Sequence, residues 1–277
     1  MTNISLGFIG GGHMASSLIH GLIKSGYPHQ YIFASDPGEE KREALKKQFS
    51  IQCFENNKTL TERANVLVLA IKPDHVNAVA LEIKDVVDSK NPLIISIVTG
   101  ITTAHLHSLF GAKASIVRAM PNTGALLQVG ATGLFADGKV SEEQKSLAES
   151  ILRSVGITVW LNHEHDLDTV TALSGSGPAY FFLVMAALAE GATQLGLSRE
   201  VAKLLTLQTA LGAARMAMES ENPLEQLIQQ VSVKGGTTEH ALKVLEEGGI
   251  KKLLQTALKA AKNRAEELSS SFENDTL

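Results

Sequence analysis

The stretch Gly7-Phe8-Ile9-Gly10-Gly11-Gly12-His13-Met14-Ala15 lies near the start of this 277-residue chain and predicts its fold. An apolar run precedes the three glycines, and apolar residues at helical spacing follow them. This order predicts a strand, a tight turn and the start of a helix. Gly10, Gly12 and Ala15 fit the pattern G-x-G-x-x-A, which is typical of dinucleotide-binding sites. We therefore expect such a site here, and the alternative is a glycine turn with a purely structural role.

Each small residue of this pattern has an expected task. Gly10 permits the sharp turn, Gly12 lets a pyrophosphate approach the backbone, and Ala15 lets helix and strand pack closely. The free N–H groups at the helix start then face the phosphates, where the helix dipole favours negative charge.

The first half of the chain alternates apolar, strand-like runs with helical segments such as residues 39–49. The expected strands cover residues 4–9, 31–34, 51–54, 66–71, 93–98, 115–118, 131–135 and 157–161. This rhythm predicts an open, doubly wound, Rossmann-like α/β sheet with ligands at the carboxyl ends of its strands. We expect Ala70-Ile71-Lys72-Pro73 and Ile97-Val98-Thr99-Gly100 to line that edge. For Lys72, a solvated charge at a strand end is an equal alternative.

After about residue 163 the strand-like runs end and helices follow. The expected helices cover residues 177–195, 199–218, 223–231, 235–249 and 250–268. We predict a dinucleotide-binding domain over residues 1–163 and an all-helical substrate-binding and dimerisation domain over residues 164–277. The first of these helices is apolar nearly all round, so we expect it to be buried. A second copy of the chain would bury it well, which predicts a homodimer, with a monomeric bundle as the alternative.

Composition narrows the function classes. The net charge of −4 argues against nucleic acid or an anionic membrane as the main partner. The most apolar stretch, residues 180–189, is too short to span a bilayer. The single cysteine, Cys53, excludes a disulfide framework and a cysteine-rich metal site. We expect a soluble, cytoplasmic protein.

Gly235-Gly236-Thr237-Thr238 stands at a predicted helix start and carries the sharpest chemical signal of the second half. Several unpaired backbone N–H groups there suit a carboxylate, and a threonine hydroxyl beside them can bond a ring nitrogen. An ordinary helix start is an equal alternative. Small residues in Leu173-Ser174-Gly175-Ser176-Gly177-Pro178-Ala179 likewise allow a cofactor ring to approach, or simply begin a helix.

Five segments together resemble the pyrroline-5-carboxylate reductase family, and they extend over nearly the whole chain. They are Gly7–Ala15, Ala70–Pro73, Met120–Thr123, Leu173–Tyr180 and Gln230–Leu242. The last segment is the most specific, because many dinucleotide enzymes share only the first.

The resemblance implies hydride transfer from NADPH or NADH to the imine carbon of 1-pyrroline-5-carboxylate, giving L-proline. It implies that Thr238 is the catalytic residue and bonds the ring nitrogen. Backbone amides around Gly236 and Thr237 would hold the substrate carboxylate. Gly235 would belong to the same substrate site, and Glu221 would lie at the substrate pocket. The implied cofactor contacts are Gly10, Gly11, Gly12, His13, Met14, Asp36, Asn57 or Asn56, Ala70, Ile71, Lys72, Pro73, Ile97, Val98 and Thr99. A homodimer through the C-terminal helices is also implied, with larger rings up to a decamer above it.

Two positions depart from the family's usual pattern. Asp36 follows Gly12 at the distance where an acid prefers the free 2′-hydroxyl of NADH and repels the 2′-phosphate of NADPH. Many relatives use NADPH, so the cofactor preference stays open, and Lys72 or a nearby loop could compensate. Gly124 replaces a usual proline, which predicts a looser loop.

Other interpretations of the chain's function remain. A β-hydroxyacid dehydrogenase has a similar layout but needs a lysine that residues 177–195 lack. A non-catalytic redox sensor would have no need of the Gly235–Thr238 segment. His163-Glu164-His165-Asp166 resembles a metal cluster in composition, but we expect a solvated linker there and no metal.

Overall fold

The computed structural model describes residues 4–274, with side chains up to residue 272. The chain divides into two compact units. Of the described residues, those up to 176 and from 261 onward form the first unit, and residues 177–260 form the second.

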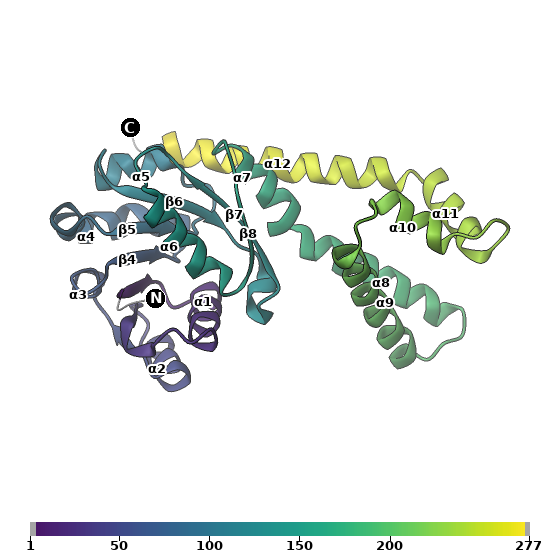
Figure 1. Ribbon diagram of the computed structural model, residues 1–277, viewed down its shortest axis with the longest axis horizontal. Coiled ribbons are helices and arrows are strands. Elements are labelled where there is room, and N and C mark those ends of the chain that lie inside the picture. The colour runs from purple at the N-terminus through teal and green to yellow at the C-terminus, as the bar shows by residue number, and fades with distance from the viewer. Residues whose placement is uncertain (1–3, 275–277) are drawn as a thin grey trace. The chain divides into compact units, whose positions relative to one another are not determined.

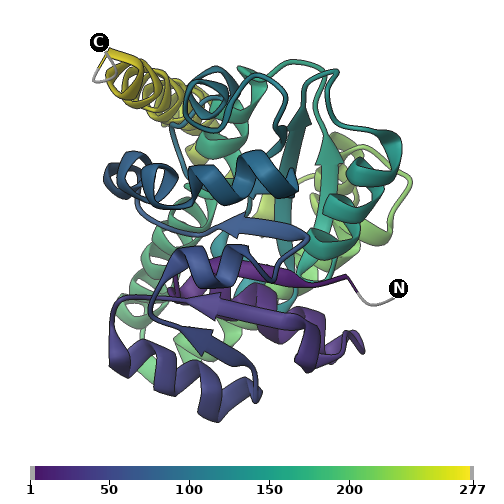
Figure 2. The same ribbon diagram turned by 90° about the vertical axis from the view of Figure 1, so that its left-hand side faces the viewer.

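An eight-stranded sheet forms the centre of the first unit, in the order β3-β2-β1-β4-β5-β6-β7-β8 (Figures 1 and 2). The strands are β1 (Leu6–Ile9), β2 (Ile32–Ser35), β3 (Gln52–Phe54), β4 (Val66–Leu69), β5 (Leu93–Ser96), β6 (Ser115–Met120), β7 (Gly130–Ala136) and β8 (Gly156–Trp160). β1 to β6 run parallel, and the strand order reverses between β1 and β4. The predicted doubly wound sheet is therefore confirmed, with small shifts at the strand ends.

The last two strands depart from the parallel pattern. β7 is antiparallel to β6, and β8 is parallel to β7. Only the short turn η3 (Thr123–Leu127) lies between β6 and β7, whereas a parallel neighbour needs a longer crossover. α6 (Glu142–Arg153) supplies such a crossover between β7 and β8. β8 begins at Gly156, where φ is +150° and a Cβ atom would lie 2.0 Å from the Gly130 carbonyl oxygen, so only glycine fits.

Side chains of the central strands alternate between two apolar cores. Leu6 and Phe8 of β1 face the core formed with α1 (His13–Lys24), α2 (Glu39–Phe49) and α6. Ile9 faces the core formed with α3 (Asn57–Thr61), α4 (Val76–Lys90) and α5 (Thr103–Phe110). Helices thus cover both faces of the sheet (Figure 2). This explains why the parallel strands read as continuous apolar runs.

The second unit, residues 177–260, is helical. It contains α8 (Gly177–Gln194), α9 (Arg199–Glu219), α10 (Leu224–Val231), α11 (Thr237–Glu247) and the first part of α12 (Ile250–Asn274). Ser198 caps α9, because its side chain accepts a hydrogen bond from the Val201 backbone N–H.

Within a single chain α8 is largely exposed, so one chain alone does not supply the predicted burial. Phe181, Phe182 and Leu183 are 70%, 64% and 71% exposed. The reason is that α8 packs against α9, which cannot cover a helix that is apolar nearly all round. A contiguous apolar surface of this kind is typical of a face that another molecule covers.

One helical stretch, Asp166–Gln194, is long and apolar enough to cross a bilayer, on length and composition alone. A single such helix is weak evidence of a membrane, since core helices of soluble proteins pass the same test. The length and composition of α8 therefore do not distinguish between a lipid surface and a protein partner as its cover.

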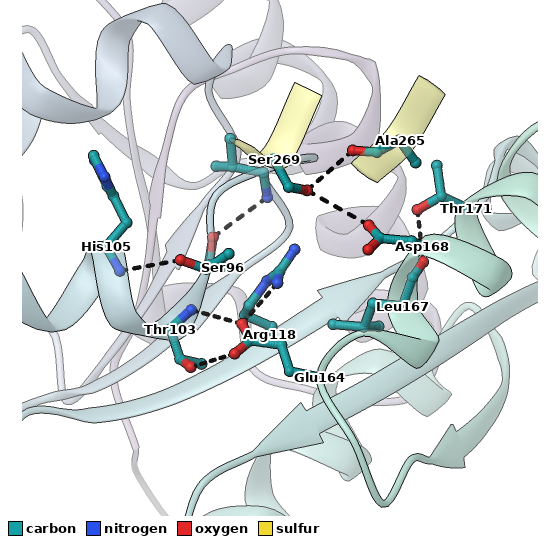
Figure 3. A network of polar contacts seen from close by, with 12 residues as sticks. Ser96, Thr103, His105, Arg118, Glu164, Leu167, Asp168, Thr171, Ala265 and Ser269 are labelled. Carbon is teal, nitrogen blue, oxygen red and sulfur yellow. Dashed lines mark hydrogen bonds and ion pairs between the residues drawn. The ribbon is translucent and has the colours of Figure 1, made fainter. Parts of the chain in front are cut away.

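The boundary between the units differs from the predicted one, because residues 164–176 and the described residues from 261 onward belong with the sheet. The Glu164 carboxylate accepts hydrogen bonds from the backbone N–H and the hydroxyl of Thr103, both at 2.6 Å, and from Arg118 at 2.7 Å (Figure 3). In α7 (Asp166–Val170), the Asp168 carboxylate accepts a hydrogen bond from the Ser269 hydroxyl of α12 at 3.5 Å. These contacts join segments far apart in sequence, so periodicity could not reveal them.

The end of α12 also packs on the sheet unit. Phe272 contacts the apolar core that holds α4 and α5. At Gly100, φ is +81° and a Cβ atom would lie 3.3 Å from the Phe272 ring. The glycine after the predicted Ile97–Thr99 segment therefore serves both a left-handed turn and the close approach of α12.

Candidate active site

The loops that follow β1, β2 and β4 are tied together at one edge of the sheet. The Gly10 N–H donates to the Ser35 carbonyl at 2.8 Å, and the Ala70 N–H donates to the Ile9 carbonyl at 2.9 Å. β1 and β4 are the strands at which the order reverses, where doubly wound sheets bind ligands. The predicted cofactor residues thus gather where the fold offers a binding edge.

The glycine loop has the geometry that its pattern predicts. At Gly10, φ is +100° and a Cβ atom would lie 2.4 Å from the Ala70 carbonyl oxygen, so a side chain is excluded. A Cβ atom at Gly12 would meet nothing within 4 Å, which leaves that side of the loop open. Ala15 is fully buried in the core. The open side at Gly12 leaves room for a phosphate group beside the backbone.

The start of α1 is prepared for an anion. Gly12 is the N-cap of α1 and supplies no side-chain cap. Within the described residues of α1, the first turn contains no acidic side chain. The first N–H groups of a helix have no partner within it and carry the positive end of the dipole. The residues present therefore fit the phosphates of a dinucleotide.

Asp36 turns toward the glycine loop. One carboxylate oxygen accepts a hydrogen bond from the Gly11 N–H at 2.9 Å, and the other accepts one from the Gly38 N–H at 2.9 Å. Lys41 pairs with the same carboxylate at 3.2 Å. Burial raises the pKa of the Asp36 carboxyl, but these three donors outweigh it, and the pKa lies below its ordinary value. Asp36 is therefore an anion that holds the glycine loop to the end of β2.

The lowered pKa of Asp36 predicts a pH-dependent contribution to stability. Its folded-state pKa is below the value of about 3.9 in an unfolded chain, so Asp36 stabilises the fold above about pH 4. This contribution is lost as the pH falls through the folded-state pKa. Urea unfolding of the wild type and Asp36→Asn should show a difference in free energy of unfolding that shrinks as the solution is acidified below about pH 4. A difference that stays constant across this range would contradict the assignment.

A cavity of about 300 Å³ opens at the ends of β4, β5 and β6. The predicted residues in its lining are Met14, Ala70, Ile71, Ile97 and Thr99. Its other lining residues are Met120, Pro121, Asn122, Thr123 and Gly175, which the predicted site did not include. They belong to two of the segments that carry the family resemblance, so the signal for them was present in the sequence.

Asn122 fixes the shape of this part of the cavity. Its side-chain N–H donates to the Ser174 carbonyl at 3.0 Å, and its side-chain oxygen accepts from the Ala131 N–H at 3.1 Å. Ser174 lies in the π-helical turn η4 (Thr171–Gly175). A Cβ atom on Gly175 would lie 2.8 Å from the Met120 methyl carbon, so glycine permits this close packing.

The remaining predicted cofactor residues take different positions. Val98 is 4% exposed and its side chain packs into the core, so only its backbone is placed to contact a cofactor. Asn57 accepts a hydrogen bond from the Ser35 hydroxyl at 2.7 Å, whereas Asn56 caps α3. His13 at the start of α1, and Lys72 before the turn η2 (Pro73–His75), are exposed.

The Gly235–Thr238 segment begins α11 in the second unit, as predicted. Two of the expected free amides are occupied: the Gly235 N–H donates to the Glu239 carboxylate at 2.7 Å, and the Gly236 N–H donates to the Val233 carbonyl at 2.9 Å. The Gly236 amide, which was expected to hold the substrate carboxylate, is therefore already occupied within this chain. The amides of Thr237 and Thr238 are the ones at the helix start.

The other predicted substrate residues are accessible. Thr237 is exposed and Thr238 is half-buried. Glu221 is exposed in the turn between α9 and α10. All three lie in the second unit, whereas every lining residue of the 300 Å³ cavity lies in the first.

His163-Glu164-His165-Asp166 is not the solvated linker that we expected. Glu164 is engaged by Thr103 and Arg118, while the rings of His163 and His165 stack with their centroids 5.3 Å apart. Within residues 4–274, no group of three or more His, Cys, Asp or Glu side chains could hold a metal ion.

Two family profiles match the chain. "Pyrroline-5-carboxylate reductase dimerisation" matches residues 164–268, and "NADP oxidoreductase coenzyme F420-dependent" matches residues 5–100. The first profile therefore covers most of the helical part, and the second covers the glycine loop and the edge of the sheet.

Full-length relatives are similar over nearly the whole chain. A pyrroline-5-carboxylate reductase of Pseudomonas aeruginosa is 45% identical over 269 residues, covering 97% of this chain and 98% of the relative. The solved structure of a pyrroline-5-carboxylate reductase from Coxiella burnetii is 46% identical, with a TM-score of 0.93 and coverage of 97% and 99%. The crystal structure of a Plasmodium falciparum pyrroline carboxylate reductase with NADP bound is 32% identical, with a TM-score of 0.86 and coverage of 97% and 99%.

Proposed function

Because this chain belongs to the pyrroline-5-carboxylate reductase family, we propose which of its residues perform the reduction. The reaction transfers a hydride from NAD(P)H to the imine carbon of 1-pyrroline-5-carboxylate, and a proton reaches the ring nitrogen, giving L-proline. The observation that carries the assignment is the open amide end of α1 beside the cavity at the ends of β4, β5 and β6.

The first unit would hold the cofactor. The open side of Gly12 and the first turn of α1 would bind the pyrophosphate, and Gly10 would keep the loop against β4. Ile97, Thr99 and Met120 line the cavity in which the nicotinamide, the source of the hydride, would lie. The apolar side chains among them would keep water away from the reacting carbon.

The second unit would hold the substrate. The amides of Thr237 and Thr238 at the start of α11 suit the substrate carboxylate, and the Thr238 hydroxyl can exchange a proton with the ring nitrogen. Glu221 would lie at the edge of the substrate pocket. A protonated imine is already electrophilic, so positioning and a proton relay suffice without a strong base.

A second copy of the chain would cover α8. Support comes from the exposure of Phe181, Phe182 and Leu183 and from the dimerisation profile over residues 164–268. A protein cover would leave no apolar face of α8 for a bilayer, which fits a soluble, cytoplasmic enzyme of proline biosynthesis. Dimers would form rings up to a decamer.

The test is NADPH and NADH oxidation by the purified full chain, followed optically with and without racemic pyrroline-5-carboxylate. Substrate-dependent oxidation, with proline as the product, is expected. Light scattering of the same sample should give at least twice the mass of one chain. No substrate-dependent oxidation by protein that binds NADP⁺ would overturn the assignment.

A further inference from the structure

One acidic and two basic side chains follow β2, and their contacts in the structure differ. Asp36 follows β2, and Lys41 and Arg42 lie in α2. In doubly wound sheets an acid here bonds the ribose 2′-hydroxyl of NADH, whereas an arginine nearby accommodates the 2′-phosphate of NADPH. On sequence alone the acid predicts NADH and the arginine predicts NADPH.

The Asp36 carboxylate is already engaged in hydrogen bonds within the protein. Its side chain is 5% exposed, and each oxygen already accepts a hydrogen bond from a backbone amide, one from Gly11 and one from Gly38. Using this carboxylate to bind a ribose would compete with the bond that holds the glycine loop. Asp36 therefore acts first as a positioning residue for the loop.

The Arg42 guanidinium is also engaged in hydrogen bonds within the protein. Its side chain is 14% exposed, and one guanidinium nitrogen donates to the carbonyls of Asp36 and Pro37, each at 2.8 Å. Glu55 lies 3.8 Å from another of its nitrogens. Arg42 thus holds the turn after β2, and leaving that position would unpair two backbone carbonyls.

Lys41 is the more exposed of the two cations. Its side chain is 59% exposed, and its ammonium lies 3.2 Å from the Asp36 carboxylate. An exposed ion pair of this kind contributes little to stability, so the ammonium can move at small cost. A flexible lysine with three donors can bridge Asp36 and a phosphate at once.

We propose that Lys41 is the specificity-determining residue that admits the 2′-phosphate of NADPH in spite of Asp36. It offsets the carboxylate and supplies the charge that a phosphate monoester requires. Glu39 and Glu40, both exposed in the first turn of α2, oppose it, which leaves Lys41 as the necessary counter-charge. NADH lacks the phosphate and gains little from Lys41.

Calorimetric binding of NADP⁺ and NAD⁺, without substrate, tests the proposal on the full chain. Lys41→Gln should raise the Kd for NADP⁺ about 10-fold, equivalent to about 1.4 kcal/mol, and change the Kd for NAD⁺ by less than about 2-fold. The loss should shrink as salt is added, since the pair is exposed. Lys47→Gln is the matched control, because Lys47 is an exposed lysine more than one turn further along α2.

Equal changes for both cofactors in Lys41→Gln, or none for either, would overturn the proposal. Asp36→Asn gives an independent outcome: a positioning residue predicts weaker binding of both cofactors. Tighter NADP⁺ binding with weaker NAD⁺ binding would instead make Asp36 the discriminating residue. Because binding is measured without pyrroline-5-carboxylate, failure here is distinguishable from failure of the proposed reduction.

Discussion

Replacing Thr238 with alanine is expected to lower kcat about 10- to 100-fold and to leave the Kd for NADP⁺ unchanged. The hydroxyl would bond the ring nitrogen as it becomes the amine of proline, and a hydrogen bond to a charged group contributes about 1.5–3 kcal/mol. That energy corresponds to the expected loss of rate. Cofactor binding should be unaffected, because the residues proposed to bind the cofactor lie in the other unit.

Steady-state oxidation of NADPH and calorimetric binding of NADP⁺ measure the two quantities for Thr238→Ala. Thr238→Ser keeps the hydroxyl and should recover most of the activity. Thr256→Ala is the matched control: Thr256 is an exposed threonine of α12 whose hydroxyl donates to the Lys252 carbonyl. Turnover of Thr238→Ala equal to that of the wild type would remove Thr238 from the mechanism.

Local pattern was sufficient to predict the sheet and the geometry of the glycine loop. α2 has the predicted bounds, residues 39–49, and Gly10 has the positive φ that the glycine pattern requires. These features depend on short-range rules: apolar periodicity, the need for glycine at a left-handed turn, and buried strands that are apolar throughout.

Long-range pairing set the limits of sequence-based prediction. Glu164 and Thr103 are 61 positions apart, and no periodicity marks a contact of that kind. The sequence likewise could not show whether Lys41 or Arg42 is available to a phosphate. That depends on the hydrogen bonds that Arg42 donates to two backbone carbonyls. The exposure of α8 could not be read from one sequence either, because its apolar character is equally consistent with an intramolecular cover and with a second chain.

Replacing Glu164 with alanine is expected to lower the free energy of unfolding by about 2–4 kcal/mol, because it leaves a buried cation without its partner. The Arg118 side chain is 8% exposed, and its guanidinium lies 2.7 Å from the Glu164 carboxylate (Figure 3). The change also removes both acceptors of Thr103. The expected loss of unfolding free energy is smaller than for a fully buried ion pair, because the Glu164 side chain is 24% exposed.

Urea unfolding at neutral pH measures this loss, and two variants separate its causes. Glu164→Gln keeps an acceptor for Arg118 and a partner for the Thr103 hydroxyl, so it should cost less than the alanine change. Glu267→Ala removes a carboxylate whose pair with Arg264 is largely exposed, and it should change stability by about 0.5 kcal/mol or less. If Glu164→Ala were as mild as Glu267→Ala, the Arg118–Glu164 pair would not be what holds residues 164–176 to the sheet. The contacts of Asp168 with Ser269 and of Phe272 with the core would then have to carry that junction.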